Sequence, residues 1–211
     1  LVNEQECAKL AGYDAVIAFG MGLHWTDEDR EQVRALDAKH IPYMVMMPTT
    51  PDNELNSIDS AKRSVLIAYL LGGGTSNFRS GFNYLRQEVL GKSLRTGTIE
   101  EPIRYAGDLL FAKNEEDRAF SSVAEFQEYY KDHGYKEGAP KVALLTGMIG
   151  PFNANRDFLD SIIVGLESAG MNVYPMSTGE KRIEFLREVS PDVVLYFPHG
   201  RIAAGRSAEA E

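Results

Sequence analysis

The chain has 211 residues, and with 44% hydrophobic and 25% charged residues its composition is typical of a folded globular protein and excludes a disordered or collagen-like chain. The 22 basic and 31 acidic residues give a net charge of −9, which argues against a nucleic-acid-binding surface because phosphate contacts need a dense basic face. The longest uncharged stretch, residues 64–78, is interrupted by glycines and is shorter than the roughly 20 apolar residues of a membrane span.

The chain carries one cysteine, Cys7. A single thiol excludes an intrachain disulfide framework and a cysteine-based zinc site, and it is typical of a reducing compartment. No signal peptide is visible, so we expect a cytoplasmic protein. Because the sequence starts at Leu1 without a methionine and stops within an Ala/Glu run, we also expect a piece of a longer chain.

Residues 1–56 form the end of a first α/β unit. The apolar run 13–19 predicts a buried strand, and residues 41–47 predict the next one. Between them, Thr26 with Asp29 three residues later makes a capping box, which marks the start of a helix. One strand–helix–strand unit is therefore expected here, with the upstream part of its sheet outside this chain.

Residues 57–137 predict a mainly helical connecting segment. Apolar residues recur at helical spacing on both sides of the glycine triplet 72–74, which predicts two helices with a break between them. A short strand is expected at 108–111, and an amphipathic helix is expected to begin at Ser121 or Ser122.

Residues 138–211 form the start of a second α/β unit and give the clearest pattern. Short apolar runs at 141–147, 171–176 and 193–197 predict strands, and the helical segment between the first two carries Phe158 among its apolar residues. Alternating strands and helices over such a short span predict three adjacent parallel strands with right-handed crossovers and helices on the faces. The predicted fold class is α/β, built from flavodoxin- or Rossmann-like parallel βαβ units that a helical segment joins.

Two glycine-containing segments match nucleotide-binding motifs only in part. The run Gly20-Met-Gly22-Leu-His-Trp25 follows a strand, as a dinucleotide fingerprint should, but Trp25 stands where the third glycine is needed. Leu90-Gly-Lys-Ser93 matches only the tail of a phosphate loop, and it follows a helix instead of a strand. We therefore expect a tight turn at the first segment and no phosphate site at the second.

The four histidines do not pair with each other or with carboxylates at the spacing of metal ligands, so no metal site is expected. No nucleophile motif and no catalytic carboxylate pair can be identified, and the catalytic residues are unknown. Two of the histidines, His24 and His199, each follow a predicted strand directly.

The candidate ligand-binding residues lie in loops that follow predicted strands. In an open α/β sheet these loops meet at one edge, where ligands bind, and a helix starting near Asn155 adds free backbone N–H groups. The candidates are Asn153, Asn155, Arg156, Ser177, Thr178, His199 and Arg201 in the second unit, and His24 in the first. The alternative is that these residues only form caps and turns, and that the loop histidines are structural or solvated.

Three blocks of sequence carry a resemblance to a known family. Tyr-Leu-Leu-Gly-Gly-Gly-Thr-Ser-Asn at 69–77, followed by Phe-Asn-Tyr-Leu at 82–85, is similar to a glycine pair, asparagine and helix of that family. Residues 142–173 resemble its strand, asparagine turn, helix and Leu-x-x-x-Gly-x-x-Val segment. The family is that of the cobaltochelatase large subunit (CobN) and the H subunit of magnesium chelatase. The resemblance adds Asn77 to the candidate binding residues.

The resemblance implies an ATP-dependent metal chelatase, a ligase that forms nitrogen–metal bonds. In such an enzyme the large subunit binds the tetrapyrrole, separate AAA+ motor subunits hydrolyse ATP, and a divalent metal is the substrate. The metal is cobalt, inserted into a corrin precursor, or magnesium, inserted into protoporphyrin. We expect an N-terminal-side fragment of the large subunit, inactive on its own. Two alternatives stay open: a non-catalytic α/β module that binds a small ligand, and a domain that docks partner subunits.

Overall fold

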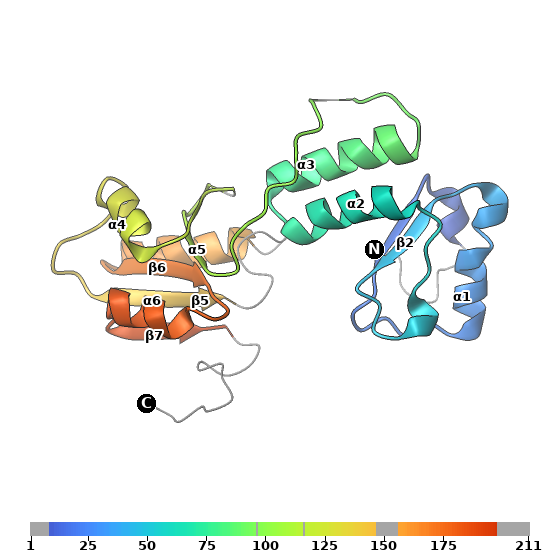
Figure 1. Ribbon diagram of the computed structural model, residues 1–211. Helices are drawn as coiled ribbons and strands as arrows, with labels where there is room; N and C mark the ends of the chain where they lie inside the picture. The colour runs from blue at the N-terminus through green and yellow to red at the C-terminus, as the bar shows by residue number, and fades with distance from the viewer. Residues whose placement is uncertain (1–8, 96, 116, 147–155, 198–211) are drawn as a thin grey trace. The chain divides into compact units, whose positions relative to one another are not determined.

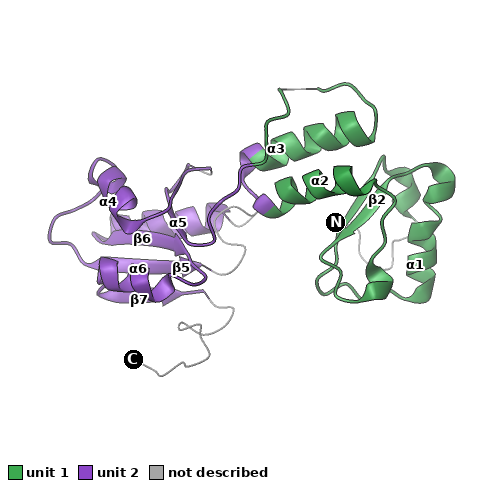
Figure 2. Cartoon of the chain, in the orientation of Figure 1, with its two compact units in different colours: residues 1–71, 77–102 green, residues 72–76, 103–211 purple. Residues whose placement is uncertain are grey.

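The computed structural model describes residues 9–95, 97–115, 117–146 and 156–197 (Figure 1). They form two compact units: the first contains the residues up to 71 together with 77–102, and the second contains 72–76 and the residues from 103 on (Figure 2). Each unit combines parallel strands with helices, so the expected α/β class is confirmed. The segment 57–137, which the sequence presents as one connection, is divided between the two units.

The first unit is built on two parallel strands. β1 (Val16–Phe19) pairs with β2 (Tyr43–Met46), and helix α1 (Asp27–Arg34) connects them. The predicted capping box is confirmed, because the Thr26 hydroxyl accepts a bond from the Asp29 amide while the Asp29 carboxylate accepts one from the Thr26 amide. Both strands are shorter than the apolar runs that predict them.

Helices cover both faces of this small sheet. Tyr43 and Val45 of β2 pack with Val33 of α1, whereas Met44 packs on the opposite face with Leu66 of α2 (Ser60–Gly72). Helix α3 (Thr75–Tyr84) follows and continues into a π-helical turn (Leu85–Val89). The two helices predicted around the glycine triplet are therefore confirmed, and β2 is buried on both sides.

The second unit is a five-stranded sheet in the order β4–β3–β6–β5–β7 (Figure 1). The strands are β3 (Leu109–Phe111), β4 (Ala119–Phe120), β5 (Lys141–Thr146), β6 (Asn172–Ser177) and β7 (Val193–Tyr196). β5 pairs in parallel with both β6 and β7, which confirms the three adjacent parallel strands. The sequence does not reveal the two antiparallel pairs, β3 with β6 and β3 with β4.

Three helices cover the two faces of the second sheet. They are α4 (Val123–Lys131), α5 (Arg156–Ser168) and α6 (Arg182–Val189). Leu144 of β5 packs on one face with Ile163 of α5. Its neighbour Leu145 packs on the other face with Phe126 of α4 and Phe185 of α6. Such burial on both faces is usual for a central parallel strand.

One apolar residue of α5 does not face the core as the periodicity predicts. Phe158 is 59% exposed, whereas its neighbour Leu159 is 6% exposed. Successive helical residues are about 100° apart around the axis, so Phe158 can face solvent while Leu159 faces the sheet. The Phe158 ring instead meets the ring of Phe197 edge to face, with centroids 6.1 Å apart. Phe158, which the apolar periodicity groups with Leu159 and Ile163, therefore lies outside the buried face of α5.

Candidate functional site

The parallel pairing brings the ends of β5, β6 and β7 to one edge of the second unit. Thr146 lies opposite Ser177, and Leu145 lies opposite Tyr196, so the loops after these strands leave the sheet together. This is the edge at which open α/β sheets bind ligands. Four of the predicted binding residues lie outside the described residues: Asn153, Asn155, His199 and Arg201.

Thr178 belongs to a polar group that holds the loop after β6. Arg182 donates from Nε to the Thr178 hydroxyl at 3.2 Å and from Nη2 to the Thr178 carbonyl at 2.9 Å. Its Nη1 donates to the Tyr196 hydroxyl at 3.3 Å, and the guanidinium lies 5.4 Å from the centre of that ring. Thr178 is 7% exposed, so it braces the loop from inside.

The amides of the same loop bind a carboxylate that the chain itself supplies. Asp108 Oδ1 accepts a bond from the Gly179 amide at 2.7 Å and another from the Lys181 amide at 3.0 Å. Asp108 reaches this edge because β3 runs antiparallel to β6, with Leu109 opposite Ser177. Amides that precede a helix are suited to anions, and here the anion is internal.

Arg156 lies in the first turn of α5 and is buried with its charge paired. Its Nε donates to Asp160 at 3.0 Å, and the two side chains are 5% and 10% exposed. The guanidinium also donates to the Ala112 carbonyl and lies 4.8 Å from the centre of the Phe111 ring. Arg156 therefore joins α5 to β3 within the second unit.

A second carboxylate, Asp117, anchors the turn between α2 and α3. It accepts bonds from the Ser76 hydroxyl at 2.5 Å and the Tyr105 hydroxyl at 3.0 Å. Burial and the Asp117 charge raise the pKa of Tyr105, which therefore stays a donor. Gly74 is required here, because a Cβ would lie 2.4 Å from Asp117 Oδ1 and the φ of +83° favours glycine. Asn77, in the next turn, is 1% exposed.

A cavity beneath α4 and α5 is too small for a ligand. Its volume is about 10 Å³, enough for about one water molecule. Beside it the buried Glu167 carboxylate pairs with Lys113 and accepts a bond from the Tyr130 hydroxyl at 2.8 Å. Burial raises the pKa of Tyr130, so that hydroxyl remains a donor. These groups hold the two helices in place.

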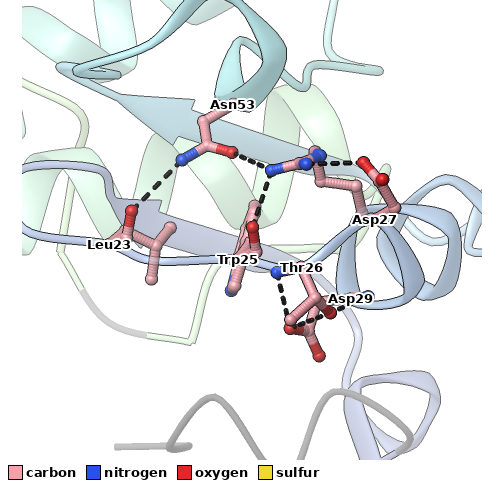
Figure 3. Close-up of polar contacts among 7 residues, drawn as sticks. Leu23, Trp25, Thr26, Asp27, Asp29 and Asn53 are labelled. Carbon is pink, nitrogen blue, oxygen red and sulfur yellow. Dashed lines mark hydrogen bonds and ion pairs between the residues drawn. The ribbon is translucent and has the colours of Figure 1, made fainter.

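In the first unit, side chains from two other segments hold the loop after β1 (Figure 3). Asn53, which follows β2, donates from Nδ2 to the Leu23 carbonyl at 3.2 Å. Arg30 of α1 donates from Nη1 to the Trp25 carbonyl at 2.7 Å and to Asn53 Oδ1 at 3.1 Å. The carbonyls on either side of His24 are therefore fixed, and His24 itself is exposed.

Exposed apolar side chains surround the ends of β1 and β2. Phe19 is 40% exposed, and Met21 and Met47 are each 45% exposed. The two strand ends are in contact, because the Gly20 amide donates to the Met46 carbonyl at 2.7 Å. A Cβ on Gly20 would lie 3.0 Å from the Met47 carbonyl oxygen, so glycine permits this approach. The tight turn predicted after β1 is confirmed.

Sequence reasoning misses several polar residues at these two edges: Arg30, Asn53, Asp108 and Arg182. The spacing of four residues between Thr178 and Arg182 is a signal that could have been used, because such residues neighbour each other near a helix start. Asp108 could not have been found, since its place depends on the antiparallel pairing of β3 with β6.

The part of the chain that the structure describes contains neither a metal-binding cluster nor a membrane-spanning helix. Within it, no three or more His, Cys, Asp or Glu side chains group closely enough to hold a metal ion. None of its helices has the length and apolar character needed to cross a membrane.

Comparison with known proteins identifies the family of this chain and a solved structure with a similar fold. The family model described as CobN/Magnesium Chelatase matches residues 67–211. No curated protein sequence matches the chain. A solved structure, the catalytic subunit of cobaltochelatase from Mycobacterium tuberculosis, is similar with a TM-score of 0.57 and 14% sequence identity over 92% of this chain. This chain spans 15% of that one, and at such identity the likeness concerns the fold alone.

Proposed function

This chain belongs to the CobN/magnesium chelatase family, and from that premise we propose that it is part of the tetrapyrrole-binding large subunit of an ATP-dependent metal chelatase. Cobalt or magnesium is a substrate of that enzyme, and AAA+ partner subunits hydrolyse the ATP in the cytoplasm. The observation that carries the proposal is the family match over residues 67–211, which includes every strand of the second sheet.

The ligand-binding edge of this proposal is the carboxyl edge of β5, β6 and β7. Crossover helices leave on opposite faces there, α5 on one and α6 on the other, and such a point opens a crevice for a ligand. Asn153, Asn155, Ser177, His199 and Arg201 are the direct contacts. The planar fork of an arginine suits the carboxylates that rim a tetrapyrrole.

The other predicted residues of the second unit support the site indirectly. The Arg156 guanidinium is bonded to Asp160 and the Ala112 carbonyl, so it fixes the first turn of α5. Thr178 is bonded to Arg182 and fixes the loop after β6. Asn77 belongs to the first unit, where it is buried in α3.

The test is tetrapyrrole binding by the full-length protein that contains these residues. Losing one charge-assisted hydrogen bond weakens binding about ten- to a hundredfold, so Arg201→Ala and Asn155→Ala are each expected to raise Kd by that factor. Their melting temperatures are expected to stay at the wild-type value. The matched control is Arg95→Ala, which removes an exposed arginine of the first unit and is expected to bind like wild type.

Two outcomes would contradict the proposal: one concerns the proposed binding residues, and the other concerns the chelatase role. If both variants bind like wild type, or if they unfold, the residues are caps and packing residues. If wild-type protein binds no tetrapyrrole, a non-catalytic ligand-binding or subunit-docking role replaces the chelatase role.

The piece of chain with residues 1–211 is proposed to be inactive by itself. Its two partial glycine motifs lack the features of a phosphate loop. Purified alone, it is expected to show neither ATP hydrolysis nor metal insertion above a buffer control. Either activity would contradict the proposal that this piece is inactive by itself.

A further inference from the structure

One edge of the second sheet, at β4, is built in a way that discourages further pairing. β4 is two residues long, and Arg118 precedes it directly. The Arg118 guanidinium lies 5.7 Å from the centre of the Phe120 ring and 4.4 Å from the centre of the Tyr129 ring. Short strands and charged side chains are usual means of keeping another strand from a sheet edge. The sheet therefore ends at β4.

The opposite edge, at β7, has neither feature. The run Val-Val-Leu-Tyr-Phe at 193–197 is apolar throughout, without a charge or a proline. In the described part of the chain, β5 is the only strand that pairs with β7. Alternate backbone groups of a strand face opposite sides, so half of those of β7 face away from β5. Such an edge is a template for a further strand.

The side chains of β7 are also uncovered on both faces of the sheet. Leu195 packs on the α5 face and Tyr196 on the α6 face, so Val193 and Val194 lie on these two faces in turn. Val193 is 48% exposed and Val194 is 39% exposed, whereas Val142, the partner of Val193 on β5, is 1% exposed. A continuous apolar run is typical of a strand buried on both faces. β7 thus combines the sequence of an interior strand with the exposure of an edge strand.

The order of the strands indicates what continues the sheet. From β6 the chain crosses to the far side of β5 to form β7, and α6 lies on the face opposite to α5. A doubly wound sheet grows outward from such a reversal, and each right-handed crossover adds a parallel strand at the outer edge. The next strand of this winding pairs with β7. This chain spans only 15% of the similar cobaltochelatase subunit, so a protein of that length has ample residues to supply the strand and its crossover helix.

We propose that in the full-length protein a strand that follows residue 211 pairs in parallel with β7, and that its crossover helix covers Val194 on the α6 face. The inference rests on the proposed function, which makes this chain part of a larger subunit. The edge at β7 is then an interface within one molecule. Because the added strand is parallel, the loop after it joins the carboxyl edge of β5, β6 and β7, and residues outside 1–211 complete the proposed ligand-binding edge.

The first experiment measures whether a side chain of β7 is covered in the full-length protein. Val194→Cys is treated with N-ethylmaleimide, and mass spectrometry of peptides follows this thiol separately from any other. Its reaction is expected to be at least about a hundredfold slower than after unfolding in urea, because a covered thiol reacts only when the structure opens. Equal rates before and after unfolding would show an open edge and overturn the proposal.

Val164→Cys is the matched control for this labelling. Val164 is 43% exposed, close to the 39% of Val194, and it lies on α5 near the exposed Ser161 and Ser168. A strand added to β7 does not cover this polar face of α5. Val164→Cys is therefore expected to react within about tenfold of its unfolded rate. Equally slow labelling at both sites would contradict the proposal.

Hydrogen exchange of the unsubstituted full-length protein repeats the test without a new side chain. Every amide of an interior strand is bonded within the sheet, whereas about half of the amides of an edge strand face away from it. The amides of residues 193–196 are therefore expected to exchange as slowly as those of residues 142–145 on β5. Fast exchange of half of the β7 amides would show that the sheet ends at β7.

Dilution separates a segment of the same molecule from a second copy. The slow exchange of β7 is expected to persist at concentrations at which the full-length protein is monomeric by light scattering. Slow exchange that disappears as a dimer dissociates would assign the edge to a second copy and overturn the proposal. These outcomes are independent of ligand binding: if β7 is open and wild type binds tetrapyrrole, the inference fails and the proposed function stands.

Discussion

At the end of β1, the side chains of Arg30 and Asn53 hold a loop by donating bonds to its backbone carbonyls. At the ends of β6 and β7, by contrast, the described polar side chains bond to each other and to the loop itself. Arg182 donates hydrogen bonds to Thr178 and Tyr196. Asp108 accepts bonds from the backbone amides that an external anion would need. The two edges share parallel strand pairing, yet at the first edge side chains hold the carbonyls of the loop, whereas at the second edge Asp108 also occupies its amides.

This contrast shows what the position of a residue after a strand does and does not indicate. Such a position places a side chain at the ligand-binding edge of the sheet. Whether its polar atoms are available depends on what packs beside the loop, and only the three-dimensional structure supplies those neighbours. Exposure therefore separates the buried Thr178, which braces its loop, from His24, which is exposed.

The largest loss of stability is expected at Arg156, whose charged side chain is almost fully buried. Arg156→Ala leaves the buried Asp160 carboxylate without its partner, and breaking such a pair destabilises a protein by about 3–5 kcal/mol. Hydrogen exchange of the β3 and β5 amides in the full-length protein should accelerate accordingly, whereas the exposed neighbour Asp157→Asn should change little. Unchanged exchange with lost tetrapyrrole binding would make Arg156 a direct contact and remove the contrast between the edges.

A smaller loss is expected at the anchored glycine turn. Gly74→Ala imposes a left-handed φ on alanine, which costs about 1–2 kcal/mol, and also drives a Cβ against Asp117. Gly138→Ala is the control in the same unit, because its φ of +73° carries the same penalty with open space around it. Unfolding measurements should therefore show a larger loss for the first variant. Equal losses would mean that Asp117 moves aside freely and does not anchor the turn.

A loss of about 1 kcal/mol is expected when the Thr178 hydroxyl is removed. Thr178→Val deprives Arg182 of one acceptor, and a single hydrogen bond contributes roughly that amount. Thr178→Ser keeps the acceptor and should retain wild-type stability. If Thr178→Val instead leaves stability intact and weakens tetrapyrrole binding tenfold, the hydroxyl contacts the ligand.

The smallest change in stability at neutral pH is expected for Tyr129→Phe. Burial and the bond that the Tyr129 hydroxyl donates to Glu115 at 2.6 Å raise the pKa of Tyr129 from 10.0 to about 12. A raised folded-state pKa stabilises the protein fully below pH 10, and this stabilisation is lost as the pH rises towards 12. Stability of wild type should therefore fall more steeply over this range than that of Tyr129→Phe. Parallel curves would show that this hydroxyl ionises as easily in the folded protein as in the unfolded one.

Much of the fold could be predicted because its elements follow local patterns. The capping box at Thr26, the glycine break between α2 and α3, and the apolar runs of β5 and β6 are all visible in sequence. The short strand expected at 108–111 is confirmed as β3, whereas β4 is only two residues long, and a run this short carries no usable periodicity. Their antiparallel pairing, which brings Asp108 to the loop after β6, therefore comes only from the structure.

The candidate site was less predictable than the fold. Strand ends place Ser177, Thr178 and His24 at edges, but the sequence does not distinguish the buried Thr178 from the exposed His24. Arg156 looks like a free cation beside a helix start, and its burial arises from Asp160 one turn later together with β3. The bond between Arg30 and Asn53, which both hold the loop after β1, joins residues 23 positions apart, a distance at which sequence patterns give no guidance.

The proposed chelatase role is tested most directly by a tetrapyrrole titration of the full-length wild-type protein, followed by absorbance, with Arg201→Ala and Asn155→Ala alongside. Saturable binding by wild type is expected, with Kd about ten- to a hundredfold higher for Arg201→Ala and for Asn155→Ala. Absence of saturable binding by the wild-type protein would contradict the proposed chelatase role.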